Sequence, residues 1–134
     1  MQISVVQPQF VDYAWRDGAA CLSEACDASG GEITGDQLKL ILARGERTLV
    51  RLDDEGAVGW GVFRVDQLPN IRALHITDLV CHNAQYQRFF DQLKDIARAM
   101  GCSEVRCSCR PAQARLFKRT NGFEEVYTTL RVQI

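Results

Sequence analysis

The fold is decided by residues 89–107, which read FFDQLKDIARAMGCSEVRC. Apolar side chains recur there every three or four residues, as they do on one face of a helix. These residues are Phe89, Leu93, Ile96, Ala97 and Met100. Gly101 is the residue type that commonly ends a helix, and Glu104–Cys109 then has the character of a strand. The stretch therefore predicts an amphipathic helix that leads directly into a strand.

Three strands are predicted before this helix. They are Thr48–Leu52, Ala57–Val65 and Ile71–Cys81, which are rich in apolar residues and separated by turn-forming residues. Such short connections favour an antiparallel meander. Because a helix joins Ile71–Cys81 to Glu104–Cys109, we expect those two strands to be parallel.

The N-terminal region is predicted to hold a short strand followed by helices. Ile3–Gln7 is apolar and ends before a proline, and apolar residues recur at helical spacing over residues 9–28. Thr34-Gly35-Asp36-Gln37 has the form of a capping box, in which each outer side chain bonds the backbone amide of the other outer residue. A further helix is expected from this point to Arg44-Gly45.

The C-terminal region is predicted to hold one more helix and one more strand. Pro111 suits the first turn of a helix that ends near Asn121-Gly122, and Phe123–Ile134 alternates as a long strand. The element order is then β-α-α-β-β-β-α-β-α-β, an α/β fold with a mixed sheet and helices on its faces. No linker or repeat interrupts the sequence, so we expect residues 1–134 to form a single domain.

Composition and charge narrow the classes of function. The chain has 134 residues, with 16 basic and 17 acidic side chains and a formal charge of −1. This balance gives no general attraction to nucleic acid or to anionic membranes. The first residues lack the pattern of a signal peptide, and no apolar run is long enough to cross a bilayer, so a cytoplasmic protein is expected. In that compartment the six cysteines are expected to be free thiols.

The last third of the chain carries a family resemblance. The segments concerned are Ala97–Arg106, Ala114–Phe117 and Asn121–Glu124. In this order and spacing they resemble a helix, the strand after it, and the next helix and turn of the GNAT superfamily of N-acetyltransferases. The resemblance extends over nearly the whole chain. It implies the GNAT-like fold and, for an active member, acetyl-CoA as the cofactor.

The cofactor loop departs from the family pattern. GNAT enzymes hold the pyrophosphate of acetyl-CoA in a loop of the form Q/R-x-x-G-x-G/A, where glycines let backbone amides close around phosphate. The matching segment here is Cys81–Tyr86, with Ala84 and Tyr86 at the two glycine positions. A tyrosine ring there is expected to fill space that the phosphates need. The cofactor contacts that the resemblance would assign are Val80, Cys81, Asn83, Ala84 and Gln85.

The candidate catalytic residues precede this loop. In an active acetyltransferase, His75 or Asp78 would be the general base that takes the amine proton. The ordinary alternative for His75 is a half-buried structural residue. The general acid of many GNAT enzymes, a tyrosine on the last helix, corresponds to Lys118 or Phe117, depending on the alignment.

Two further groups of residues are candidates for binding. The segment that lines the substrate cleft in GNAT enzymes corresponds to Gly59, Trp60 and Gly61. Thiols and an imidazole occur at Cys81-His82 and at Cys107-x-Cys109, but their spacing fits none of the common zinc motifs. Buried thiols are the expected outcome there, and no metal is assigned.

Two interpretations of function are weighed, of which the first is favoured. The small size and altered loop resemble GNAT-like proteins of bacteriophages and prophages, including an internal virion protein of short-tailed phages. That resemblance implies a non-catalytic structural or accessory factor, without a cofactor, that meets a virion or host protein. The alternative is an active acetyl-CoA-dependent N-acetyltransferase for a small amine or a protein. The β-forming residues Tyr127–Ile134 also allow contact with a partner through the last strand, including an edge-strand dimer.

Overall fold

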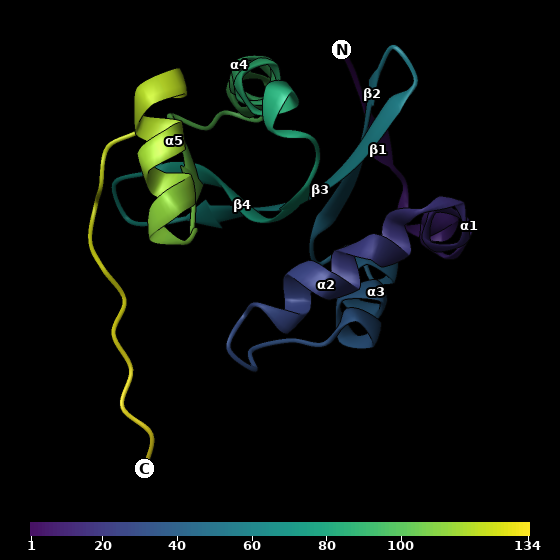
Figure 1. Cartoon of the computed structure of the whole chain (residues 1–134), viewed down its shortest axis with the longest axis horizontal. Coiled ribbons are helices and arrows are strands. Elements are labelled where there is room, and N and C mark those ends of the chain that lie inside the picture. The colour runs from purple at the N-terminus through teal and green to yellow at the C-terminus, as the bar shows by residue number, and fades with distance from the viewer.

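A mixed five-stranded sheet carries helices on both of its faces (Figure 1). The computed structural model describes residues 1–134, apart from the side chain of Asn83. The strand order is β1-β2-β3-β4-β5, in which neighbours up to β4 are antiparallel and β4 and β5 are parallel. The strands are β1 (Gln2–Val6), β2 (Thr48–Asp54), β3 (Ala57–Gln67), β4 (Arg72–Val80) and β5 (Glu104–Cys107). The predicted α/β class, meander and parallel pair are confirmed.

Three helices from the N-terminal region cover one face of the sheet. They are α1 (Val11–Asp17), α2 (Leu22–Asp27) and α3 (Gly35–Ala43), with short 3-10 turns at Pro8–Phe10 and Ala19–Cys21. The helical stretch predicted over residues 9–28 is divided at Gly18, whose φ of 137° is rarely accessible to residues with a side chain. The predicted capping box opens α3: Gln37 N donates to Thr34 Oγ1 at 3.2 Å, and Thr34 N donates to Gln37 Oε1 at 3.0 Å.

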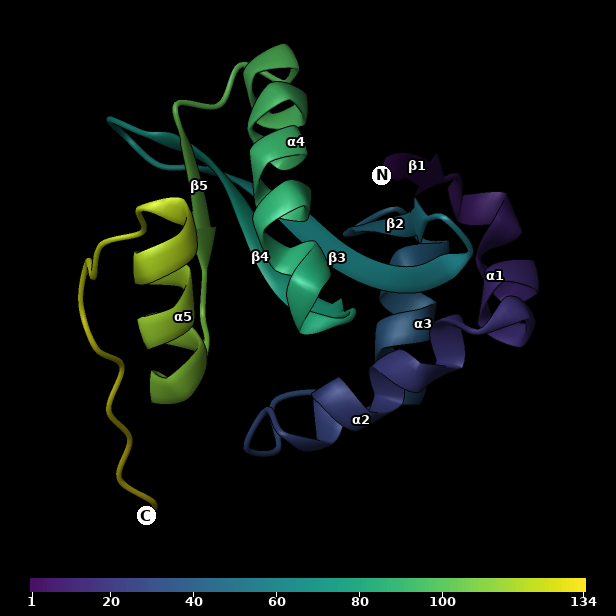
Figure 2. The same ribbon diagram turned by 45° about the horizontal axis from the view of Figure 1, so that its top comes forward.

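The opposite face is covered by α4 (Tyr86–Ala99) and α5 (Pro111–Asn121). Figure 2 shows α4 lying across the sheet, with α5 beside it. The predicted apolar stripe of α4 faces inward as far as Ala97, and Phe89, Phe90 and Leu93 are almost completely buried against strand residues such as Phe63 and Leu74. Met100, the last predicted member of the stripe, lies beyond the helix and is 37% exposed. A short 3-10 turn, Asn83–Gln85, connects β4 to α4.

The predicted final strand is wrong, because Phe123–Ile134 pairs with no strand. Phe123 packs against Phe90 and Phe117, at ring-centroid distances of 4.9 and 6.0 Å. The chain after it, which we call the tail (residues 124–134), runs outward past α5 and ends clear of the sheet in both views (Figures 1 and 2). Alternating side chains favour a strand, but a strand also needs a neighbour for its backbone groups.

Candidate functional site

β4 and β5 separate at the middle of the molecule. They pair from Ala73 with Glu104 to Ile76 with Cys107, but β4 continues to Val80 whereas β5 ends. We call residues 77–80 of β4 and residues 108–110 after β5 the fork. On the side of β5, the backbone of residues 77–80 has no strand partner in the described chain. The fork is therefore a place where a ligand can meet main-chain groups inside the fold.

A β-bulge at Thr77 sets the direction of the next side chain. Phe63 pairs with Ile76, but Val62 pairs with Asp78, so Thr77 is an extra residue in β4. Strict alternation would direct Asp78 to the α4 face together with Ile76. The bulge instead brings Asp78 to the face that α1–α3 cover, where it meets Cys26 of α2.

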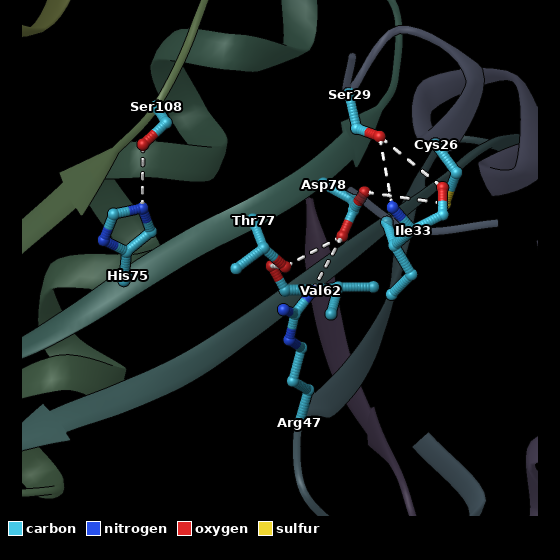
Figure 3. Close-up of polar contacts among 9 residues, drawn as sticks. All are labelled: Cys26, Ser29, Ile33, Arg47, Val62, His75, Thr77, Asp78 and Ser108. Atoms are coloured by element: carbon cyan, nitrogen blue, oxygen red, sulfur yellow. Dashed lines mark hydrogen bonds and ion pairs between the residues drawn. The ribbon is translucent and has the colours of Figure 1, made fainter. Parts of the chain in front are cut away.

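Asp78 is a buried carboxylate with few partners, 8% exposed (Figure 3). Thr77 Oγ1 donates a hydrogen bond to Asp78 Oδ2 at 2.8 Å. Arg47 Nη1 lies 3.9 Å from the same oxygen, and Cys26 Sγ lies 4.0 Å from Oδ1. Burial raises the pKa of Asp78, and the Thr77 hydrogen bond and the Arg47 charge oppose that rise. A carboxylate with a raised pKa is a stronger base than an exposed one.

His75 lies on the same strand in a different environment. Its Nε2 is 3.2 Å from Ser108 Oγ, and its Nδ1 is 3.8 Å from Asp66 Oδ2. Burial lowers the pKa of His75, with a further lowering by the Arg64 charge that Asp66 opposes. Figure 3 shows His75 directed to Ser108, apart from Asp78 and its partners. The two predicted catalytic residues therefore do not form a pair, and each has its own surroundings.

The loop between β4 and α4 is closed on itself by Gln85, which is 2% exposed. Gln85 Oε1 accepts a hydrogen bond from the His82 amide at 2.9 Å, and its Nε2 donates to the Ala57 carbonyl at 3.2 Å. The predicted contact residues Val80 and Cys81 are partly buried beside it, and Ala84 is exposed. The side chain of the remaining predicted residue, Asn83, lies outside the described structure. Gln85 thus uses one loop amide that a phosphate would otherwise meet.

The ring of Tyr86 does not cover the N-terminus of α4, the helix that Tyr86 begins. Its side chain is 9% exposed and turns into the core between α4 and α5. The ring meets Phe117 edge to face, with centroids 5.3 Å apart and planes at 76°. The two residues that align with the general acid of the family are both engaged, since Phe117 is buried and Lys118 pairs with Glu125. Phe117 has no acidic proton to donate, and the Lys118 ammonium is held by Glu125.

The first turn of α4 is the part of this region that suits an anion. Gln85, its N-cap residue, makes no side-chain capping bond, and the turn contains no acidic residue. The first amides of a helix lack partners within the helix and attract negative charge. Because the Tyr86 ring is turned inward, it does not fill the space in front of this turn, and backbone amides alone would have to hold the phosphates of acetyl-CoA. Such binding would lack the glycines that let the family's loop close around the phosphates.

A pocket of ≈ 500 Å³ lies beside the loop, at the end of β4. Its lining includes Trp60 from the predicted cleft segment and Val80 and Cys81 from the predicted cofactor segment. Gly59 and Gly61 do not line it. They allow close packing instead: a Cβ on Gly59 would lie 2.8 Å from Cys81 Cβ, and one on Gly61 would lie 3.2 Å from Val50 Cγ2.

The pocket also has polar walls that the sequence analysis did not assign. Asp17, Arg51 and His82 line it, and Asp17 Oδ2 lies 3.9 Å from Arg51 Nε. Among the described side chains, Arg51 Nε is a buried nitrogen with no hydrogen-bond partner. Asp17 and Arg51 come from α1 and β2, far from the loop in sequence, so no local motif could have indicated them. His82 lies within the predicted loop segment Cys81–Tyr86 but was not assigned a contact.

The thiols near the fork are protonated and apolar in character. Burial raises the pKa of Cys81 and of Cys107 to about 12, and that of Cys26 to about 11. Thiols with such values are poor nucleophiles and poor metal ligands at neutral pH. Within the described residues, no group of three or more His, Cys, Asp or Glu side chains is placed to hold a metal ion. None of the described helices has the length and apolar character needed to span a membrane.

The fold of the chain resembles that of solved acetyltransferases. No family model and no curated protein matches the chain. A probable acetyltransferase superimposes with a TM-score of 0.71 at 15% identity, over 100% of this chain and 99% of that one. The chain has an acetyltransferase fold. A ribosomal-protein-alanine N-acetyltransferase from Brucella melitensis biovar Abortus 2308 gives a TM-score of 0.69 at 14% identity, over all of both chains. A soil metagenomic aminoglycoside acetyltransferase in complex with sisomicin gives 0.69 at 14%, over 99% and 95%.

These similarities establish the fold, which is that of the GNAT acetyltransferases. One named protein modifies a ribosomal protein and another an aminoglycoside, so the fold itself does not select an acceptor. The similar structures do not bear on the bacteriophage resemblance.

Proposed function

We propose that the protein is an acetyl-CoA-dependent N-acetyltransferase that acts on an amine. The observation that carries the proposal is the buried carboxylate of Asp78, which a bulge holds at the point where β4 and β5 separate. The full-length likeness to acetyltransferases supports it, since the fork lies inside the shared fold. Acetyl-CoA would supply an acetyl group activated as a thioester. The backbone from Val80 to Gln85 and the first turn of α4 would hold its phosphates.

The chain's own residues account for removal of the amine proton. An ammonium group must lose a proton before its nitrogen can attack, and burial raises the pKa of Asp78, which makes it a stronger base than an exposed carboxylate. Asp78 is nearly inaccessible, but Thr77 is less buried and donates to it at 2.8 Å. The Thr77 hydroxyl can therefore accept a proton from the amine while passing its own to Asp78. Arg47, at 3.9 Å, keeps the carboxylate ionised before that transfer.

The pocket beside Trp60 supplies an acceptor site in this proposal. It adjoins the end of β4, and a cationic amine bound there would compete with Arg51, 3.9 Å away, for the Asp17 carboxylate. Trp60 is 3% exposed and forms an apolar wall that removes water from the bound group. An amine attached to an apolar or polar body of modest size would suit this mixed lining.

The proposal is tested by adding acetyl-CoA to the folded protein and its variants. Binding at a hundred times Kd should stabilise the fold by about 2.7 kcal/mol, which thermal melting detects readily. Asp78→Asn should lower acetyl transfer to a panel of amines by about 10²–10⁴-fold, the usual contribution of a general base. The coenzyme-dependent melting shift should remain, because Asp78 lies outside the phosphate-binding turn. His75→Gln is the matched control and should retain activity. A flat melting curve up to millimolar acetyl-CoA would contradict the proposal.

A second candidate function is a non-catalytic accessory role. The observation that favours it is Gln85, whose side chain occupies the loop and bonds the His82 amide. Ala84 and Tyr86 also stand where the family has glycines. This function predicts no coenzyme binding and no acetyl transfer, so the same experiment separates the two candidates.

A further inference from the structure

A second hollow adjoins the acceptor pocket, by which we mean the pocket of ≈ 500 Å³ at the end of β4. It has a volume of ≈ 340 Å³ and is lined by residues from the end of β1, from the 3-10 turn Pro8–Phe10 and from α1. Three residues line both hollows, namely Asp17, Arg51 and Trp60. These residues form a shared wall, so a ligand in the acceptor pocket can extend past them into the second hollow.

The second hollow, which we call the apolar hollow, follows one side of α1. Four of its lining residues have the spacing of a single helix face: Phe10, Tyr13, Ala14 and Asp17. Ala14 is 5% exposed and belongs to the floor, whereas Phe10 and Tyr13 are 57% and 68% exposed and belong to the rim. Exposed aromatic side chains that gather around a hollow are typical of a site that binds an apolar group.

The shared wall carries an excess of negative charge. Two carboxylates face the single guanidinium of Arg51: Asp53 Oδ2 lies 3.2 Å from its Nη1, and Asp17 Oδ2 lies 3.9 Å from its Nε. The longer of these separations is too long for a hydrogen bond. The Asp17 side chain is 52% exposed, so it can bind an ammonium group while Arg51 stays paired with Asp53. A cationic ligand therefore suits this wall better than an anionic one.

The strand register sets the length of such a ligand. Arg51 pairs with Trp60, and Trp60 pairs with Val80, so the three residues lie in one row across β2, β3 and β4. Neighbouring strands are about 4.8 Å apart, which puts Val80 about 10 Å from Arg51. A ligand whose body lies in the apolar hollow must send its amine along this row to reach the end of β4. An aromatic ring with an arm of a few methylene groups has this reach.

We propose that the acceptor is a primary amine joined by a short flexible arm to an aromatic or other bulky apolar body. The body lies in the apolar hollow against Phe10 and Tyr13, and the arm passes Trp60. The amine occupies the acceptor pocket, which Asp17 and Val80 both line. This inference rests on the proposed acetyl transfer and adds the class of acceptor to it. One ammonium and one acetyl thioester react: the nitrogen–carbon bond forms, the carbon–sulfur bond breaks, and the products are the amide, the coenzyme thiol and one proton.

Acetyl transfer to two probe amines tests this class of acceptor. Phenylbutylamine and butylamine share the amine and the arm and differ only in the ring. The wild-type kcat/KM should be roughly 10-fold or more higher for phenylbutylamine, because apolar pockets discriminate on this scale. Phe10→Ala with Tyr13→Ala should bring the ratio of the two kcat/KM values close to one, mainly by raising KM for phenylbutylamine. Leu40→Ala, at a 49% exposed position of α3 outside both hollows, is the matched control and should keep the wild-type ratio.

The outcomes separate the acceptor class from the proposed function. Equal kcat/KM values for the two amines in wild type would overturn the acceptor class and leave acetyl transfer in place. A ratio that survives the loss of both aromatic rings would do the same. Absence of transfer to every amine, together with a flat melting curve with acetyl-CoA, would instead contradict acetyl transfer itself.

Calorimetric titration without coenzyme gives a second measurement, which does not depend on acetyl transfer. The folded protein should bind phenylbutylamine more tightly than butylamine, and Asp17→Asn should weaken binding of phenylbutylamine several-fold. Asp12→Asn removes an exposed carboxylate from the same helix, outside both hollows, and should bind like wild type. Equal binding of the two amines would overturn the proposal, and so would equal binding by Asp17→Asn and Asp12→Asn.

Discussion

The two faces of the sheet differ in what they bury. Under α4 and α5 the core consists of aliphatic side chains and aromatic rings such as Phe89 and Phe90. Under α1–α3 the apolar core also surrounds the Asp78 carboxylate, and Arg51 Nε, beside Asp17 of α1, has no hydrogen-bond partner among the described residues. Burying poorly paired polar groups costs stability. The difference indicates that the α4 face stabilises the fold, whereas the α1–α3 face gives up stability to hold reactive groups.

The largest expected effect tests the stabilising role of the α4 face. Phe89 is 0% exposed, so Phe89→Ala leaves a large cavity and should lower the free energy of unfolding by about 3–5 kcal/mol. Phe10, which is 57% exposed, provides the matched control. Phe10→Ala should change the free energy of unfolding by less than about 0.5 kcal/mol. Urea unfolding of both variants measures the difference. Equal losses in the two variants would contradict the stabilising role assigned to the core under α4.

A smaller effect is expected at the boundary between the core and the pocket. In Gly59→Ala the new Cβ would lie 2.8 Å from Cys81 Cβ and 2.9 Å from the Val80 carbonyl, so the backbone there must move. We expect a loss of about 1–3 kcal/mol, together with weaker acetyl-CoA binding, because Val80 and Cys81 begin the cofactor loop. Gly61→Ala is the control, since its nearest neighbour is a side-chain methyl of Val50 at 3.2 Å. Chemical denaturation and coenzyme titration should both show the larger change in Gly59→Ala.

The elements that the sequence predicts best depend on local interactions. The α4 stripe follows from spacing along one helix, and the capping box at Thr34 and Gln37 needs only residues three apart. The break of the helix at Gly18 is local as well, because glycine weakens a helix interior. The missing last strand depends on the rest of the fold. Residues 124–134 have the alternation of a strand, but pairing depends on a neighbour that sequence alone does not supply.

The candidate site was less predictable for the same reason. Asp78 was recognised as a candidate from its place before the loop, but its direction is set by a bulge at Thr77 that no residue pattern reveals. Tyr86 was expected to fill the phosphate site, and the ring instead turns toward Phe117, a residue on another helix. Asp17 and Arg51 reach the pocket from α1 and β2 through tertiary packing. Such contacts exist only once the sheet has formed.

The smallest expected effect measures how much stability the α1–α3 face gives up at Asp78. Because burial raises the folded-state pKa above the unfolded value of about 3.9, protonated Asp78 favours the fold. That contribution is complete below the unfolded pKa and is lost as pH rises through the folded pKa. Asp78→Asn carries no such proton, so its stability relative to wild type should rise over this pH window and then level. Urea unfolding of wild type and Asp78→Asn across the acid range measures this difference in stability. Asp91→Asn, at an exposed position of α4, is the control. A relative stability that falls with rising pH would mean that Arg47 and Thr77 outweigh burial, and that the polar face costs the fold nothing at this residue.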